Sequence, residues 1–246
     1  MTSGLLTKLL FYGFLLYASL RLLRSSKVPV RELFVGRISK KDWIWILPLG
    51  GLVFAFQICA GLVWTDQFVR LIPDLYLNMF LRPQPYSLMS SAVDTLLAPP
   101  LEELFSRGGL LLFLANKVGM KWAAIISSFL FALLHIEFVG HFVGALIFVC
   151  LYLKTSSLLA PIVVHYLFDG WVFISKAMDP AKELSPVTLA DIHSAAMEVR
   201  LPLIPLSIAI LYCLYRFWPL LNDGKGPRVR AFDFQKAEAG PAQLPK

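Results

Sequence analysis

WIWILPLGGLVFAFQICAGLVW, the run from Trp43 to Trp64, holds no charged side chain in 22 residues. A membrane-spanning helix needs about 20 apolar residues to cross the hydrocarbon layer of a bilayer, so this run is long enough to span it. The other apolar runs also lack the polar–apolar alternation that is typical of membrane β-barrel strands. Lipid supplies no water to unpaired backbone groups, and helices satisfy these groups internally. The sequence therefore predicts an all-α, polytopic transmembrane helix bundle.

The composition of the whole chain also indicates a membrane protein. Of its 246 residues, 57% are hydrophobic and 16% are charged, and the mean hydropathy is +0.67. A soluble globular chain is about one quarter charged. The formal net charge of +7 is explained by orientation across the bilayer, so we predict no nucleic-acid partner. The three cysteines lie inside apolar runs and form neither a disulfide framework nor a zinc-type spacing.

Seven segments are predicted to cross the membrane. The first is interpreted as a retained helix, because its positive charges follow the apolar run whereas those of a signal peptide precede it. The fifth is the shortest, and at its length a re-entrant or buried helix is equally possible. The predicted segments are 5–23, 43–64, 88–116, 122–138, 140–153, 158–175 and 201–220.

The basic residues of the connections predict the orientation of these segments. With seven spans, the Lys and Arg residues of the connection 24–42, two later gaps and the C-terminal tail all lie on one side of the membrane. The basic residues of the other side are mixed with Asp and Glu. The positive-inside rule then places the N-terminus outside and the C-terminus in the cytoplasm, at the plasma membrane if the cell is prokaryotic. Residues 66–85 mix charged and apolar residues as a helix lying in the interface does. Residues 1–221 are predicted to form the membrane domain, and residues 222–246, rich in Gly, Pro, Lys and Ala, a disordered cytoplasmic tail.

Three clusters of ionisable residues interrupt the predicted helices, where such groups are costly and mark functional sites by default. The first is EELFSR, residues 102–107. Glu103 and Arg107 are four residues apart and can pair on one helix face, although a purely structural ion cluster is an equally good interpretation. Glu102 lies about 100° around the helix, so we expect it to face the site and to lie closer than Glu103 to the histidines. The preceding Pro99-Pro100 is expected to kink or restart the helix.

The second and third clusters carry histidines. His135 ends the stretch FALLH, residues 131–135, in the fourth segment, and alone it would more often be a packing residue than a catalyst. His165 and Asp169 lie four residues apart in the sixth segment, on one helix face. Asp169 could hold the imidazole tautomer, or it could position a neighbouring carbonyl or water.

Together the clusters supply groups that activate water. A carboxylate base, with imidazoles that steady an oxyanion or bind a metal, can converge from three helices. The motifs Gly-x-Ser-x-Gly and His-Glu-x-x-His are both absent, which argues against an α/β-hydrolase and an ordinary zincin. Of the other histidines, His141 is expected outside the site more often than in it, and His193 is expected to be solvated. The side chains expected around one polar cavity are Glu102, His135, His165 and Asp169.

The motifs occur in the order Glu-Glu-x-x-x-Arg, Phe-x-x-x-His and His-x-x-x-Asp, over about residues 90–175. In this order they resemble the CAAX protease and bacteriocin-processing family (CPBP or ABI family), also called the type II CAAX prenyl endopeptidases. The residues that match are Glu102, Glu103, Arg107 and Gly108 in the first motif, Phe131 and His135 in the second, and His165 and Asp169 in the third.

This resemblance implies a helical bundle with a water-filled conical cavity and an intramembrane endopeptidase activity. Eukaryotic members of the family remove the three terminal residues of prenylated CAAX proteins. Many prokaryotic members process or protect against peptides such as bacteriocins, or act as sorting-type proteases. The expected partner is therefore a membrane-anchored protein or peptide. The expected roles are Glu102 as general base with help from His135, His165 and Asp169 at the oxyanion, and Glu103, Arg107 and Phe131 as supporting residues.

Two questions stay open in the sequence. The residues fit a metal-free glutamate and histidine mechanism, which we favour because the polar groups are scattered singly. They also fit a divalent metal such as zinc, held by Glu102, His135 and His165. The alternatives to a protease are a non-catalytic immunity or scaffold protein of the same fold and a transporter or proton-relay protein. The former would be expected to lose a motif residue and the latter to show inverted repeats, and the sequence shows neither feature.

Overall fold

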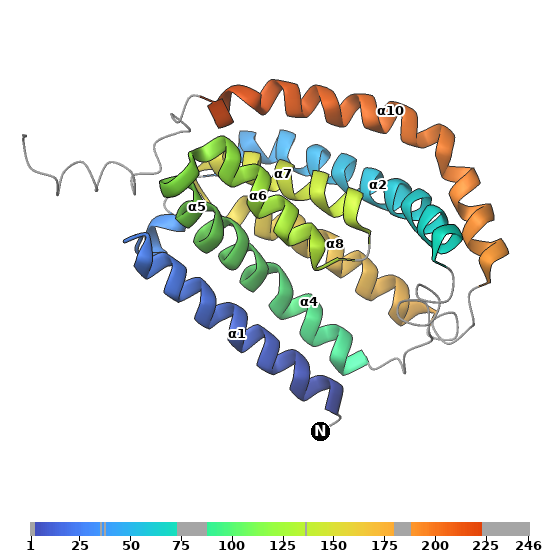
Figure 1. The fold of residues 1–246 in the computed structure, drawn as a ribbon, viewed down its shortest axis with the longest axis horizontal. Coiled ribbons are helices and arrows are strands. Elements are labelled where there is room, and N and C mark those ends of the chain that lie inside the picture. The colour runs from blue at the N-terminus through green and yellow to red at the C-terminus, as the bar shows by residue number, and fades with distance from the viewer. Residues whose placement is uncertain are drawn as a thin grey trace, which may run out of the picture.

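A computed structural model describes residues 3–34, 36, 38–72, 88–135, 137–179 and 188–222. These residues form a helical bundle in which no strand occurs, as predicted. Figure 1 shows segments that are far apart in the sequence running side by side. The elements are α1 (Ser3–Ser25), the 3-10 turn η1 (Val30–Phe34), α2 (Lys40–Leu71), α4 (Leu88–Glu103), the π-helix η2 (Leu104–Leu110), α5 (Leu111–Val118), α6 (Met120–Leu133), α7 (Phe138–Thr155), α8 (Leu159–Met178) and α10 (Leu189–Asn222).

Each predicted span coincides with a helix, although some boundaries differ. The third segment is one helical path through α4, η2 and α5. α2 continues to Leu71, so it takes up the start of the stretch that was expected to lie in the interface, and residues 73–87 lie outside the described residues. Asn222 is the last residue of α10, and the rest of the predicted tail lies outside the described residues as well.

The short fifth segment forms the centre of the bundle. α7 has 18 residues, and every side chain from Ile147 to Leu153 is buried. It packs against α2, α6, α8 and α10. A helix that is apolar all round belongs in the interior of a protein or membrane domain. At 1.5 Å per residue it is about 27 Å long, so a complete helix replaces the re-entrant alternative.

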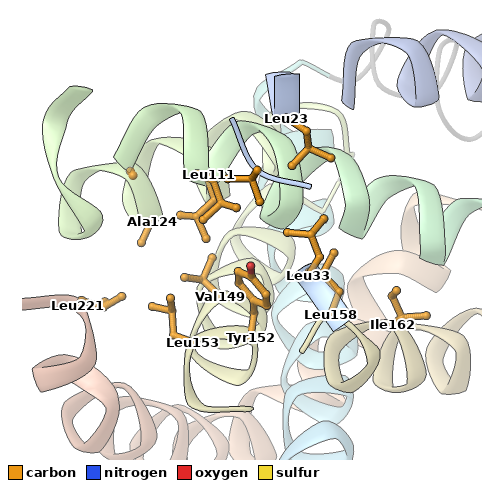
Figure 2. Close-up of a cluster of buried hydrophobic side chains, with 13 residues drawn as sticks. Leu23, Leu33, Leu111, Ala124, Val149, Tyr152, Leu153, Leu158, Ile162 and Leu221 are labelled. Atoms are coloured by element: carbon orange, nitrogen blue, oxygen red, sulfur yellow. The ribbon is translucent and has the colours of Figure 1, made fainter. Parts of the chain in front are cut away.

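A buried apolar cluster holds one end of the bundle together (Figure 2). Leu111 of α5 and Ala124 of α6 are fully buried, and they pack with Val149 and Leu153 of α7. Leu158, just before α8, is also fully buried in this cluster. Between helices in lipid, close packing of this kind takes the place of the hydrophobic driving force that acts in water.

The outer helices present large apolar side chains to their surroundings. α1 and α10 lie at opposite edges of the bundle (Figure 1). Phe14 of α1 is 61% exposed, and Leu201 and Ile208 of α10 are 77% and 65% exposed. Such faces suit lipid. Within the part of the chain that the structure describes, four helices are long and apolar enough to cross a membrane, namely Leu5–Ser25, Lys40–Leu71, Phe138–Thr155 and Leu189–Leu221.

A polar contact ties α1 to α4. The Tyr12 hydroxyl donates to Asp94 Oδ1 at 2.9 Å, and Lys8 forms an ion pair with the other oxygen of the same carboxylate. Tyr12 also belongs to an apolar cluster with Leu15 and Ala98. α1 is therefore fixed beside α4, the helix that carries the first motif.

Candidate active site

The site begins in α4, where the helix loses a backbone hydrogen bond. Pro100 has no N–H for the carbonyl of Leu96, and the Tyr166 hydroxyl of α8 donates to that oxygen at 2.8 Å instead. Both prolines lie inside α4, which continues beyond them. The helix therefore does not restart at these prolines, and the other expected outcome, a kink, stays a prediction. The freed carbonyl instead ties α4 to α8, next to His165.

Directly after Glu103 the helix widens into the π-helix η2. The backbone N–H of Leu111 bonds to the carbonyl of Ser106, and the Ser106 hydroxyl donates to the carbonyl of Glu102. Single π turns inside α-helices occur frequently at functional sites. Because the pitch changes here, angles calculated for an ideal α-helix do not hold across this motif.

Glu103 and Arg107 form a buried ion pair, as their spacing predicted. Nη1 of Arg107 lies 2.9 Å from Oε1 of Glu103, and the two side chains are 1% and 0% exposed. Arg107 also donates to the Ser106 hydroxyl at 2.6 Å and to the carbonyl of Ala145 in α7 at 3.3 Å. Its guanidinium lies over the Phe131 ring, 4.6 Å from the centroid, which is a cation–π geometry. Arg107 thus connects the first motif to the second and to α7.

Glu103 has a second partner, His165. Nδ1 of His165 lies 3.1 Å from Oε1 of Glu103. Because an ionised carboxylate only accepts, we assign the proton to Nδ1, which leaves Nε2 facing away from Glu103. The expectation that Glu102 lies closer than Glu103 to both histidines is therefore wrong for His165. The two glutamates meet the same imidazole at its two different nitrogens.

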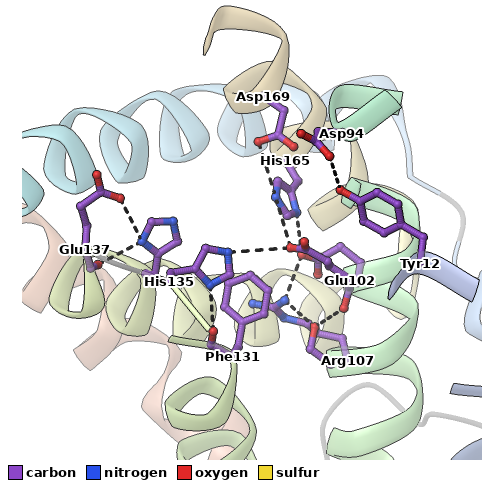
Figure 3. A network of polar contacts seen from close by, with 12 residues as sticks. Tyr12, Asp94, Glu102, Arg107, Phe131, His135, Glu137, His165 and Asp169 are labelled. Carbon is purple, nitrogen blue, oxygen red and sulfur yellow. Dashed lines mark hydrogen bonds and ion pairs between the residues drawn. The ribbon is translucent and has the colours of Figure 1, made fainter. Parts of the chain in front are cut away.

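Glu102 lies between the two imidazoles, and Figure 3 shows both rings directed toward it. Its Oε2 is 4.0 Å from Nε2 of His135 and 4.0 Å from Nε2 of His165. The two nitrogens are therefore at most 8.0 Å apart. Nδ1 of His135 lies 2.8 Å from the carbonyl of Phe131, an acceptor, so this nitrogen donates and Nε2 is left for the site. Two imidazole nitrogens thus converge on one carboxylate oxygen.

Asp169 lies one helical turn after His165. Its Oδ1 is 3.7 Å from Nε2 of His165, which is too long for a direct hydrogen bond and short enough for a strong charge interaction. The side chain of Asp169 is 29% exposed, against 11% for His165. Asp169 is thus the more accessible member of the pair.

A cavity of about 330 Å³ adjoins these residues, with walls from α2, α7 and α8. His165 and Asp169 line it, whereas Glu102 and His135 are not among its described lining residues. Of the four side chains expected around one polar cavity, only His165 and Asp169 line this one, and a polar cavity shared with Glu102 and His135 stays a prediction. Most of the lining is apolar and includes Phe54, Ile58, Leu62, Phe168 and Val172.

His135 lies outside the helix that was predicted to hold it. α6 ends at Leu133 and α7 begins at Phe138, so His135 stands on the connection between them. This break brings His141 against His135, with ring centroids 4.1 Å apart and planes at 17°. His141 also lines the cavity. The only signal for this in the sequence is the gap between the fourth and fifth predicted segments, at residue 139.

The donor chemistry of Glu102, His135 and His165 suits zinc, but their spacing does not. Tetrahedral zinc with bonds of about 2.0–2.1 Å holds its ligand atoms about 3.3–3.4 Å apart. Here the Glu102 oxygen is 4.0 Å from each imidazole nitrogen. Among the described residues, no group of three or more His, Cys, Asp or Glu side chains is close enough to hold a metal ion.

The apolar helices define an integral membrane protein, and carboxylates and imidazoles from several of its segments converge in it. Residues 84–171 match the family of type II CAAX prenyl endopeptidases, Rce1-like. The chain thus carries a domain of this family, and the resemblance shown by the motifs is confirmed. The matched range contains every residue from Glu102 to Asp169 that forms the site. Comparison with curated proteins and with solved structures gave no match.

Proposed function

We propose that the protein is an intramembrane endopeptidase in which Glu102 activates the attacking water. The family supports a CAAX-type intramembrane protease at family level. The observation that carries the mechanism is that Oε2 of Glu102 lies 4.0 Å from Nε2 of both His135 and His165. This separation exceeds a direct hydrogen bond, and it suits a water about 2.8 Å from each atom of a pair.

In this mechanism Glu102 takes a proton from the water while the oxygen attacks the scissile carbonyl. The Nε2 lone pair of neutral His135 accepts the second water hydrogen and orients the nucleophile. Glu102 then returns the proton to the leaving amine, so that one carboxyl group serves as base and as acid. The peptide bond breaks, and the water supplies the new carboxyl oxygen and the amine proton.

His165 is placed to stabilise the oxyanion. Glu103 holds its Nδ1–H, and the protonated ring donates from Nε2 to the developing negative charge. Asp169, 3.7 Å from Nε2, stabilises the cationic ring and approaches the substrate from the cavity. Arg107 balances the charge of Glu103, and Phe131 covers Arg107.

We propose that this chemistry needs no metal. The 4.0 Å separations support a bridging water better than a tetrahedral zinc ion. Elemental analysis of the purified active protein tests this proposal. We expect less than stoichiometric zinc and activity that survives dialysis against a chelator, and restoration of a chelated, inactive enzyme by zinc alone would contradict it.

The substrate is proposed to be a membrane-anchored protein or peptide, whose lipid or apolar segment enters beside the largely apolar cavity.

We further propose seven passes, with the N-terminus outside and the C-terminus in the cytoplasm, from the loop charges. A reporter fused after Lys246 should be active only in the cytoplasm. Activity only outside would overturn the orientation.

The catalytic assignment is tested with detergent-solubilised protein and a quenched fluorescent peptide ending in farnesylated Cys and three further residues. We refer to it as the farnesylated peptide. Glu102→Gln and His165→Ala are expected to lose measurable turnover while melting within a few degrees of the wild type. Glu198→Gln, an exposed carboxylate of α10, is the matched control and should retain activity. Near-wild-type turnover by either site variant would overturn the assignment.

A further inference from the structure

Gln57 is a polar side chain in the run of α2 that is otherwise apolar from Trp43 to Trp64 apart from glycines and Pro48. It lies outside the residues matched by the family. Gln57 nevertheless lines the same cavity as His165 and Asp169. The mechanism proposed above assigns it no role.

Two glycines of α7 make room for this side chain. A Cβ at Gly140 would lie 3.1 Å from the Cα and the carbonyl oxygen of Gln57, so the absence of a side chain there lets the two backbones approach. A Cβ at Gly144 would lie 2.9 Å from Nε2 of Gln57. The amide therefore rests against Gly144, at the wall of the cavity.

The amide of Gln57 has no hydrogen-bond partner among the residues that the structure describes. Gln57 is half-buried and its amide is not enclosed, so it can reach the cavity. In a membrane helix, polar side chains commonly bond to a neighbouring helix, yet the two α7 residues at which an added Cβ would meet Gln57 are glycines, which have no side chain to offer. The amide is therefore available to a molecule that enters the cavity.

We propose that Gln57 binds the main chain of the peptide substrate. This inference rests on the proposed peptidase function and deepens it. A carboxamide carries one acceptor oxygen and two N–H donors, so it can pair with the N–H or the carbonyl of a peptide bond. Besides Gln57, α2 contributes one other polar side chain to the described lining, Thr65, which already has an interaction of its own, so Gln57 is the group available to fix the backbone position. Because main-chain atoms are common to all peptides, this contact contributes affinity without selecting a side chain.

The first test measures binding of the farnesylated peptide by fluorescence anisotropy, with Glu102→Gln as the background so that nothing is cleaved. Adding Gln57→Met, which keeps the side-chain size and removes the amide, should weaken binding about 3- to 10-fold, as one hydrogen bond predicts. Adding Gly144→Ala should weaken it similarly, because the new Cβ displaces the flexible end of Gln57. The two changes together should cost no more than one alone. Gly51→Ala in α2, where a Cβ meets nothing within 4 Å, is the matched control and should bind as the background does.

A second test locates the contact on the substrate. Each peptide bond of the farnesylated peptide is replaced in turn by an ester, which removes the N–H and weakens the neighbouring carbonyl as an acceptor. One ester should weaken binding to the background protein and have no further effect once Gln57→Met is present. Unchanged binding by Gln57→Met, or a loss that couples to no ester position, would overturn the inference. Loss of turnover in Glu102→Gln together with no effect of Gln57→Met would leave the peptidase standing and reject Gln57 alone. Turnover retained by Glu102→Gln would reject the proposed mechanism first.

Discussion

Two acid–arginine pairs in this protein have the same spacing and opposite surroundings. Glu103 and Arg107 lie four residues apart beneath the cavity, with side chains 0% and 1% exposed. Asp66 and Arg70 lie four residues apart at the end of α2, where Asp66 is 4% exposed and Arg70 is 53% exposed. The carboxylate is covered in both pairs, whereas the arginine is enclosed only in the first.

Asp66, the carboxylate of the second pair, connects α2 to α10. Asp66 accepts from Arg70 at 3.1 Å, from His193 of α10 at 3.2 Å and from Arg200 of α10 at 3.5 Å. His193 is exposed as expected, with 46% of its side chain accessible, and it also bonds across to α2. Asp66 has three exposed partners, so losing one leaves the others.

Glu103, the carboxylate of the first pair, contacts a histidine of the candidate site. Glu103 accepts from Arg107 and from His165 through the same oxygen. Arg107 is fully buried. Among the described contacts of Glu103, the other partner is His165, whose charge depends on protonation, so losing Arg107 would remove the one permanent positive charge beside Glu103. The i,i+4 spacing therefore predicts which residues pair, whereas burial determines how much stability is lost when the pair is broken.

The largest effect is expected for Arg107→Ala. It removes the enclosed partner of Glu103, and breaking a buried ion pair costs about 3–5 kcal/mol. We expect a sharp fall in yield and in unfolding free energy, measured by steric trapping in bicelles, and loss of peptidase activity. Arg107→Lys should recover part of the stability, because it keeps the charge without the planar fork that reaches Ala145 and Ser106. Wild-type stability in Arg107→Ala would contradict the structural weight given to this pair.

Glu103→Gln should give the next largest effect, and mainly on the rate. Glutamine keeps the shape but removes the negative charge that accepts from Nδ1 of His165, so the cationic ring that donates to the oxyanion is no longer stabilised. Removing one oxyanion donor lowers kcat about 10²–10³-fold in other enzymes, so we expect a fall of at least about 100-fold here. KM should change little, because Glu103 is fully buried and does not line the cavity. A loss confined to KM would contradict a role in orienting His165.

Asp66→Asn tests the second, partly exposed pair. Asp66 accepts charged hydrogen bonds, and their loss should lower the unfolding free energy by about 1–3 kcal/mol. The contacts at α10 weaken, while the polar groups around Glu102 stay in place, so kcat/KM at low temperature should remain within about twofold of the wild type. A large loss of activity in a folded Asp66→Asn protein would show that α10 controls the site.

Sequence periodicity predicted the contacts that lie within one helix. The pairing of Glu103 with Arg107 and the shared face of His165 and Asp169 follow from 3.6 residues per turn. The bond between Glu103 and His165 joins residues 62 apart, so it depends on how α4 and α8 pack. The helical period alone contains no information on that packing.

Local irregularities account for the remaining differences. η2 changes the helical pitch just after Glu103. Glu102 and Glu103 both lie near His165, so they do not divide into one glutamate that faces the site and one that faces away from it. The early end of α6 moves His135 onto a connection and brings His141 against it. The all-helical bundle was predictable because apolar runs of this length have few alternatives in lipid. Both irregularities lie where the backbone departs from the regular helical period.

The smallest effect is expected for Arg70→Ala, the counterpart of Arg107→Ala. Arg70 is 53% exposed, and an exposed ion pair contributes about 1 kcal/mol or less. Asp66 would keep His193 and Arg200 as partners, so no carboxylate is left buried alone. The unfolding free energy of Arg70→Ala, measured by steric trapping as for Arg107→Ala, should fall by no more than this amount. The difference from the wild type should shrink when the salt concentration is raised, because exposed charges are screened over about 10 Å at 0.1 M and over shorter distances above it. The loss in Arg107→Ala should be insensitive to the same change, since its partner is closed off from solvent. Equal losses in the two variants, or equal salt dependence, would show that spacing rather than burial sets the strength of these pairs.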